Sequence, residues 1–209
     1  MFWNRISGIY DFVENTFNGK VNRDIAQYVA NLMDSNDVVL ECGCGTGMFS
    51  VEIAKRCKSI TATDFAEKML RQAQKKCKDC NNITFAKADI THLEYVDESF
   101  DKVVAANVIH LVENPEKAMK ELLRVCKTGG RVIIPTYIMK SNKKSSAAAG
   151  FFNILGAGFQ NEFNYESYQK FFKTMGYEVS DYYTAQGTMP CCAAIIEKKK
   201  IFGGFFSYF

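Results

Sequence analysis

Three glycines at alternating positions stand directly after an acidic residue. Glu41 ends an apolar run, and Gly43, Gly45 and Gly47 follow it. Because glycine has no Cβ atom, such a segment can turn sharply and lets a ligand approach the backbone closely. Helical spacing resumes at Met48, so the free N–H groups of a helix N-terminus would face the same place. The glycines therefore predict a ligand-binding turn between a strand and a helix.

The segments around this turn alternate between strands and helices. Apolar and β-branched runs predict strands, and segments of helical periodicity rich in good helix formers separate them. The first five predicted strands are 38–42, 59–64, 82–89, 101–106 and 131–138. A helix near 164–175 and two antiparallel strands, within 177–185 and 189–199, follow. Apolar strands that alternate with helices predict an α/β fold with a doubly wound, Rossmann-like parallel sheet.

Two more acids stand at the ends of the second and third predicted strands. They are Asp64 and Asp89. Ligands of open α/β sheets bind at the carboxyl ends of the strands, where the strand order reverses. The Asp64 carboxylate could accept both hydroxyls of a ribose. Asp89 could accept from an adenine amino group while the Ile90 N–H meets a ring nitrogen, with Phe65 and Ile90 on the two faces of the base.

Three kinds of nucleotide ligand compete for such a site. A phosphate-binding loop needs Lys and then Ser or Thr after its last glycine, whereas Met48 and Phe49 follow Gly47. A dinucleotide motif counted from Gly43 places Met48 at its third glycine position, where it is too bulky for close approach to a pyrophosphate. S-adenosylmethionine has no phosphate, and its ammonium group could be attracted by Glu41 directly or through water. The three acids therefore favour S-adenosylmethionine.

The same segments resemble class I S-adenosylmethionine-dependent methyltransferases, in the small-molecule branch similar to the enzymes of ubiquinone and menaquinone biosynthesis. The resemblance covers about residues 38–138 and rests on VVLECGCGTG, TATDFAEKML, FAKADI, FDKVVAANVIHLV and ELLRVCKTGGRVIIPT. It implies a seven-stranded, mostly parallel sheet whose last strand is antiparallel. It also implies a small-molecule acceptor, with S-adenosylhomocysteine as the product of the methyl donor.

The resemblance assigns a set of cofactor-binding residues. They are Tyr10, Glu41, Gly43, Cys44, Gly45, Asp64, Phe65, Asp89, Ile90 and Asn107. Asn107 would hold the ammonium group through its backbone carbonyl. The pair Tyr10 and Asp11 would close over the cofactor.

Methyl transfer from a sulfonium needs alignment and exclusion of water, so a dedicated catalytic residue is optional. If the acceptor carries a proton, His110, just beyond the fourth strand, is the candidate general base. It could equally be a histidine that only packs.

Simpler structural roles compete with binding at two of the acids. Asp64 could cap a helix, because Glu67 follows it at capping-box spacing. Asp89 could close a turn. Two other functions stay open for the chain as a whole, a non-catalytic S-adenosylmethionine-binding domain and an NAD-dependent oxidoreductase.

Composition narrows the class of protein. The chain has 209 residues and a net charge of +3, too balanced to predict nucleic-acid binding. It has no long uncharged apolar stretch, so we expect no transmembrane segment, and without a secretory segment we expect a cytoplasmic location. The eight cysteines are then mostly free thiols. Cys77 and Cys80 lack a second pair at zinc-finger spacing, so no metal site is expected.

We expect a single methyltransferase domain over residues 1–209. Its expected parts are an N-terminal helical lid (1–35), a cofactor-binding core (38–138), an insertion or cover (139–163), and a C-terminal helix, strand pair and tail (164–209). The apolar tail, 201–209, is a candidate surface for a homodimer.

Overall fold

The computed structural model describes residues 2–8, 10–139 and 163–199. Its strands are β1 (Val38–Cys42), β2 (Ser59–Asp64), β3 (Ile83–Lys87), β4 (Phe100–Val104), β5 (Cys126–Tyr137), β6 (Asp181–Ala185) and β7 (Cys191–Glu197). Its helices are α1 (Phe2–Ile6), α2 (Tyr10–Asn31), α3 (Met48–Ala54), α4 (Glu67–Lys76), α5 (Pro115–Val125) and α7 (Tyr165–Thr174). The expected cover and the apolar tail fall almost wholly outside the described residues.

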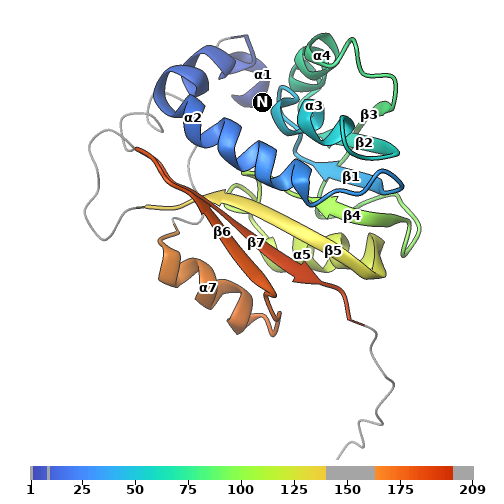
Figure 1. Ribbon diagram of the computed structural model, residues 1–209, viewed down its shortest axis with the longest axis vertical. Helices are drawn as coiled ribbons and strands as arrows, with labels where there is room; N and C mark the ends of the chain where they lie inside the picture. The colour runs from blue at the N-terminus through green and yellow to red at the C-terminus, as the bar shows by residue number, and fades with distance from the viewer. Residues whose placement is uncertain (1, 9, 140–162, 200–209) are drawn as a thin grey trace, which may run out of the picture.

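The seven strands form one sheet in the order β3-β2-β1-β4-β5-β7-β6 (Figure 1). Strands β1 to β5 pair in parallel, and β7 runs antiparallel to both of its neighbours, β5 and β6. The strand order reverses between β1 and β4, which is where ligands bind in sheets of this kind. The predicted doubly wound sheet with an antiparallel last strand is confirmed.

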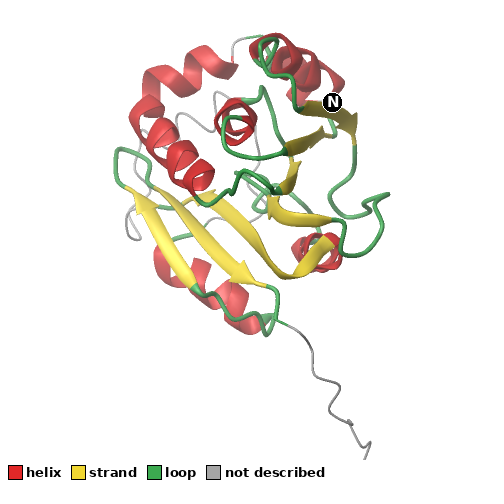
Figure 2. Cartoon of the chain, turned by 45° about the vertical axis from the view of Figure 1, so that its right-hand side comes forward, coloured by secondary structure: helices red, strands yellow, loops and turns green. Residues whose placement is uncertain are grey.

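Apolar side chains fill the space on both faces of the sheet. Helices cover each face (Figure 2). Helices α2 and α3 contribute Ile25 and Phe49 to the cluster on one face. Helices α5 and α7 contribute Met119 and Phe172 to the cluster on the other. Alternate residues of the strands point to opposite faces, so a strand buried on both faces must be apolar throughout. The acid Glu41 is an exception inside β1.

One predicted boundary is wrong, because the strand expected over 131–138 already begins at Cys126. Helix α5 ends at Val125, and the chain passes directly into β5, which contains Gly129 and Gly130. The register between β4 and β5 shifts between Phe100 and Lys102. A Cβ atom at Gly130 would lie 2.5 Å from the carbonyl oxygen of Asp101, so this glycine is needed for the close approach of the two strands.

One residue within helix α2 interrupts its helical backbone. The interruption is at Asn18, which has φ −144° and ψ 18°. The Asn18 side chain is buried, and its Nδ2 donates to the carbonyl oxygen of Met189 at 2.8 Å. The contact ties α2 to the segment between β6 and β7. No helix in the described part of the chain is long and apolar enough to cross a membrane.

Candidate functional site

A pocket of about 560 Å³ lies at the carboxyl ends of β1, β2 and β4. Its walls come from the glycine turn, the β2–α4 turn, the segment after β3, the loop between β4 and α5, and helix α1. The lining residues among those singled out in the sequence are Gly43, Cys44, Gly45, Asp64, Phe65, Asp89, Ile90 and Asn107. Eight of the ten expected cofactor-binding residues therefore share one cavity.

The glycine turn adopts the backbone that its sequence predicts. Gly43, Gly45 and Gly47 have φ values of +70°, +54° and +86°, in the left-handed region that other residues rarely adopt. A Cβ atom at Gly47 would lie 3.1 Å from the Sγ of Cys77, so this position also requires close packing against α4. The Cys44 N–H donates to the carbonyl oxygen of Thr63 at 2.8 Å and ties the turn to β2.

Asp64 joins the glycine turn to the start of α4. Its Oδ2 accepts from the Gly45 N–H at 2.9 Å, and its Oδ1 accepts from the Ala66 N–H at 2.8 Å. The N-cap of α4 is Ala66, which makes no side-chain cap, so Asp64 is not the cap of this helix. Burial raises the pKa of the Asp64 carboxyl against the opposing effect of these backbone donors. The carboxylate faces the pocket from a turn that it also stabilises.

Asp89 closes a turn and borders the pocket as well. Strand β3 ends two residues earlier than predicted, at Lys87, and Asp89 lies in the bridge to His92. The Thr91 N–H and hydroxyl both donate to Asp89 Oδ1 at 2.8 Å. Among the hydrogen bonds of the described residues, the Asp89 carboxylate uses only this oxygen, so its Oδ2 can accept from a ligand.

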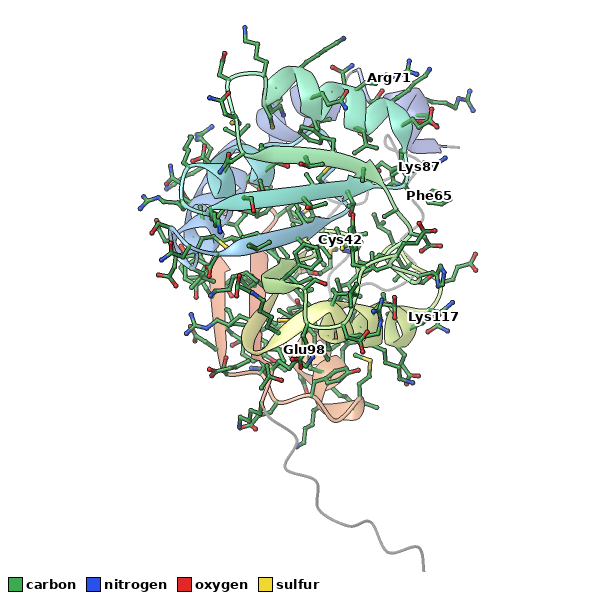
Figure 3. All side chains as sticks on the ribbon, turned by 90° about the vertical axis from the view of Figure 1, so that its right-hand side faces the viewer. Cys42, Phe65, Arg71, Lys87, Glu98 and Lys117 are labelled. Carbon is green, nitrogen blue, oxygen red and sulfur yellow. The ribbon has the colours of Figure 1, made fainter. Side chains whose placement is uncertain are left out.

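Two apolar side chains next to the acids differ in exposure. Phe65 is 52% exposed although it lines the pocket, whereas Ile90 is 8% exposed. Figure 3 shows Phe65 beside Lys87 at the edge where the parallel strands end, and the Lys87 Nζ lies 5.8 Å from the centroid of the ring. An exposed aromatic ring at the mouth of a pocket is well suited to stack against a planar ligand.

Asn107 lies three residues beyond the end of β4 and has a left-handed conformation. Its φ is +52°, and its N–H donates to the carbonyl oxygen of Pro135 at 2.8 Å. The chain turns here so that Val108 and the next residues form the far wall of the pocket. A Cβ atom at Gly43 would lie 3.0 Å from the Val108 side chain, so the glycine turn and this wall are in contact.

Glu41 does not line the pocket, which differs from its expected role as the partner of an ammonium group. Its side chain is 1% exposed, and the Ser50 hydroxyl of α3 donates to its Oε2 at 2.5 Å. Burial raises the pKa of Glu41 to about 8, with only the Ser50 hydrogen bond acting against it. Neighbouring residues of a strand point to opposite faces, and Cys42 faces the pocket. Glu41 therefore points away from it and is mostly neutral at pH 7.

His110 is also outside the pocket lining. It is 3% exposed, and burial lowers its pKa to about 3. Val108 and Leu111 line the pocket while His110 points into the protein. The role of general base stays a prediction for His110, and its burial and lowered pKa do not favour that role.

Tyr10 is the first residue of α2, and its side chain lies outside the described part of the structure.

Sequence reasoning missed several residues of the pocket. Leu111 and Val112 form an apolar wall, and Glu113 and Lys117 lie at its rim. The spacing of Val108, Leu111 and Val112 is the helix-like pattern that could have indicated a shared face. Trp3 also lines the pocket, although it lies far from the other residues in the sequence. No sequence signal links it to them.

Comparisons with known proteins agree with this architecture. The methyltransferase domain family matches residues 40–134. The chain is 41% identical over 103 residues to the ubiquinone/menaquinone biosynthesis C-methyltransferase of Bdellovibrio bacteriovorus, covering 48% of this chain and 44% of that protein. It is 32% identical over 155 residues to the phosphatidylethanolamine N-methyltransferase of Cereibacter sphaeroides, covering 71% of this chain and 74% of that protein.

Solved structures show the same fold. An S-adenosylmethionine-dependent methyltransferase from Thermotoga maritima matches with a TM-score of 0.73 at 21% identity, over 95% of this chain and 99% of that one. A methyltransferase from Aquifex aeolicus matches with a TM-score of 0.65 at 17% identity, over 88% of this chain and 90% of that one.

These findings show that the chain has the Rossmann-like fold of the methyltransferase domain. The chain belongs to the class I S-adenosylmethionine-dependent methyltransferase family. The relatives that it resembles include enzymes of ubiquinone and menaquinone biosynthesis. The methyl donor of this family is S-adenosylmethionine. The chain spans less than half of the Bdellovibrio relative.

Proposed function

We propose that the protein transfers a methyl group from S-adenosylmethionine to a small-molecule acceptor. The observation that carries this proposal is the pocket itself, in which a turn of three left-handed glycines and the carboxylates of Asp64 and Asp89 border one cavity. A neutral adenosine with a cationic amino-acid group suits this lining better than a phosphate, because two carboxylates would repel a phosphate.

We assign the parts of the cofactor to the pocket as follows. The carboxylate of Asp64 accepts from the ribose hydroxyls, and Asp89 Oδ2 accepts from the adenine amino group. The glycine turn and the backbone carbonyl of Asn107 hold the amino-acid end. Glu41 has a structural role in this proposal, because its hydrogen bond to Ser50 fixes α3 against β1 beneath the glycine turn.

The methyl donor supplies an electrophilic methyl group with a neutral leaving group. The side chains of Val108, Leu111 and Val112 exclude water beside it and would contact the apolar body of an acceptor. Alignment of the acceptor then accounts for most of the rate enhancement. His110 and His92 are the only histidines in the chain, and neither lines the pocket. An acceptor whose nucleophilic atom needs no histidine as a general base fits this arrangement best.

The relatives differ in the acceptor that their names indicate. They include a C-methyltransferase of quinone biosynthesis, a phosphatidylethanolamine N-methyltransferase and a malonyl-[acyl-carrier protein] O-methyltransferase. The apolar wall favours an acceptor with an extended apolar part. A panel of acceptors that offer carbon, nitrogen and oxygen nucleophiles on such a body is therefore the suitable first screen.

The test combines binding and turnover. Calorimetric titration with S-adenosylmethionine, S-adenosylhomocysteine and NAD(H) comes first, followed by transfer of a labelled methyl group to the acceptor panel and to a metabolite extract. We expect binding of both adenosyl ligands and a labelled small product. Binding of NAD(H) alone would favour an oxidoreductase, although Met48 lines the pocket at the position where a dinucleotide needs a small residue. Tight binding with no labelled product would favour a non-catalytic binding domain.

We also propose a cytoplasmic location. All eight cysteines are free thiols in the structure, and all but Cys80 are buried. Free thiols persist in reducing compartments, which supports this location. A homodimer through the tail at 201–209 remains our expectation from the sequence, and sedimentation of the chain with and without these residues tests it.

A further inference from the structure

Helix α1 brings an aromatic side chain to the pocket from the N-terminus of the chain. Trp3 lines the pocket, and it is the only tryptophan in the protein. It is partly buried. Figure 1 shows α1 next to α4, toward the end of the sheet that β3 and β2 form. The Trp3 side chain therefore reaches the pocket from an N-terminal helix. The glycine turn and the acids gave no indication that this helix belongs to the site.

A hydrogen bond from the neighbouring residue fixes the position of α1. The N–H of Lys68, in the first turn of α4, donates to the Asn4 side-chain Oδ1 at 3.0 Å. The first N–H groups of a helix have no partner within the helix, and a cap residue normally supplies one. The N-cap of α4, Ala66, supplies none from its side chain. Asn4 takes over this function from a distant part of the sequence.

Asp64 also makes a hydrogen bond at the N-terminus of α4. Asp64 accepts from the Ala66 N–H, and Asn4 accepts from the Lys68 N–H, two residues further along. Helix α1 is thus attached to the same helical turn as the carboxylate assigned to the ribose. Phe65, the half-exposed pocket residue, lies between Asp64 and Ala66 in the chain, directly before this helical turn. The part of the pocket nearest to α1 is therefore the part assigned to the adenosine.

We propose that Trp3 packs against the adenosine of the cofactor and that Asn4 positions it there. The proposal rests on the proposed function, since it names one more residue of the same binding site. Trp3 is a binding residue, and Asn4 is a positioning residue that acts through it. Stacking of a base on an aromatic side chain contributes about 1–3 kcal/mol by alanine substitution, which corresponds to roughly fivefold or more in affinity.

The single tryptophan makes a direct test available. The emission of the wild-type protein is recorded during titration with S-adenosylhomocysteine, adenosine and homocysteine, with calorimetry on the same samples. We expect S-adenosylhomocysteine and adenosine to change the emission with the dissociation constants that calorimetry gives. Homocysteine is expected to leave the emission unchanged.

Substitutions separate packing from positioning. We expect Trp3→Ala to weaken S-adenosylhomocysteine binding about tenfold and Trp3→Phe to weaken it about twofold. Asn4→Ala is expected to weaken binding about threefold, and Asn4→Asp to restore it, because a carboxylate also accepts from the Lys68 N–H. Tyr165→Ala, at an exposed aromatic residue outside the pocket, is the control and should bind as the wild type does.

The outcomes distinguish this proposal from the proposed function. If calorimetry detects S-adenosylhomocysteine but the emission does not change and Trp3→Ala binds normally, the role of Trp3 is refuted while the function stands. If Trp3→Ala alters only the KM of the acceptor, Trp3 contacts the acceptor and the proposal is also refuted. If no adenosyl ligand binds to the wild type, the proposed function itself fails. Thermal unfolding of each variant without ligand identifies any loss of folding.

Discussion

The buried carboxyl of Glu41 leads to a pH dependence of stability that Glu41→Gln should remove. Burial raises the pKa of Glu41 from 4.5 to about 8 in the folded protein. Between pH 4.5 and about pH 8, the Glu41 carboxyl is protonated in the folded state, whereas in the unfolded chain it has released its proton. The associated stability is complete below pH 4.5 and is lost as the pH rises to 8. At about 1.36 kcal/mol per pKa unit, the full effect is on the order of 5 kcal/mol.

The glutamine variant is neutral at every pH and can still pair with the Ser50 hydroxyl. We therefore expect the stability of Glu41→Gln relative to the wild type to rise by roughly 3 kcal/mol between pH 5.5 and 7.5. Urea unfolding followed by far-ultraviolet circular dichroism measures this difference. Glu166→Gln, at an exposed position of α7, controls for the loss of one negative charge. Parallel pH profiles for Glu41→Gln and the wild type would refute the reasoning.

Three further predictions concern the pocket. Asp64→Ala should weaken S-adenosylmethionine binding by about 1.5–3 kcal/mol in calorimetry, the range for hydrogen bonds to a charged group; unchanged affinity would leave Asp64 with only its role in the turn. Gly45→Ala should cost about 1–2 kcal/mol of stability because its φ is +54°, and should also weaken cofactor binding. Gly176→Ala, at φ +76° outside the pocket, is the control and should lose stability without a change in cofactor binding. If Gly45→Ala and Gly176→Ala change cofactor binding equally, the assignment of Gly45 to the cofactor site is contradicted. His110→Gln should retain kcat within about threefold, since losing a general base typically costs a hundredfold or more, and a loss of that size in a folded variant would restore His110 as the base.

The sequence was most informative where local chemistry decides the structure. The glycine turn could be predicted because no other residue adopts its three positive φ values at low cost. Strand β2 has the bounds that the sequence predicts, because a β-branched run ends at the acid Asp64. The doubly wound sheet followed from the alternation of strands and helices. The pocket position then followed from the rule that ligands of such sheets bind at the carboxyl ends of the strands.

Other features depended on information that local sequence does not contain. Strand alternation places Glu41 on the side of β1 opposite to Cys42, and counting the period of two could have shown this. The orientation of His110 depends on how the chain turns after Asn107. Strand β5 begins before Gly129 because of its pairing with β4, a contact between distant segments. The contribution of Trp3 depends on the docking of α1 across more than sixty residues of sequence.

The burial of the cysteines has a consequence for chemical labelling. Thiolates, not thiols, react with maleimides and iodoacetamide. Burial raises the thiol pKa of Cys42, Cys44, Cys57, Cys77, Cys126 and Cys192. Cys80 is the one cysteine that is not buried, and it lies beyond the C-terminal end of α4. A dye attached to the native protein should therefore go to Cys80 first, and this chain of eight cysteines can be handled almost as a single-cysteine protein.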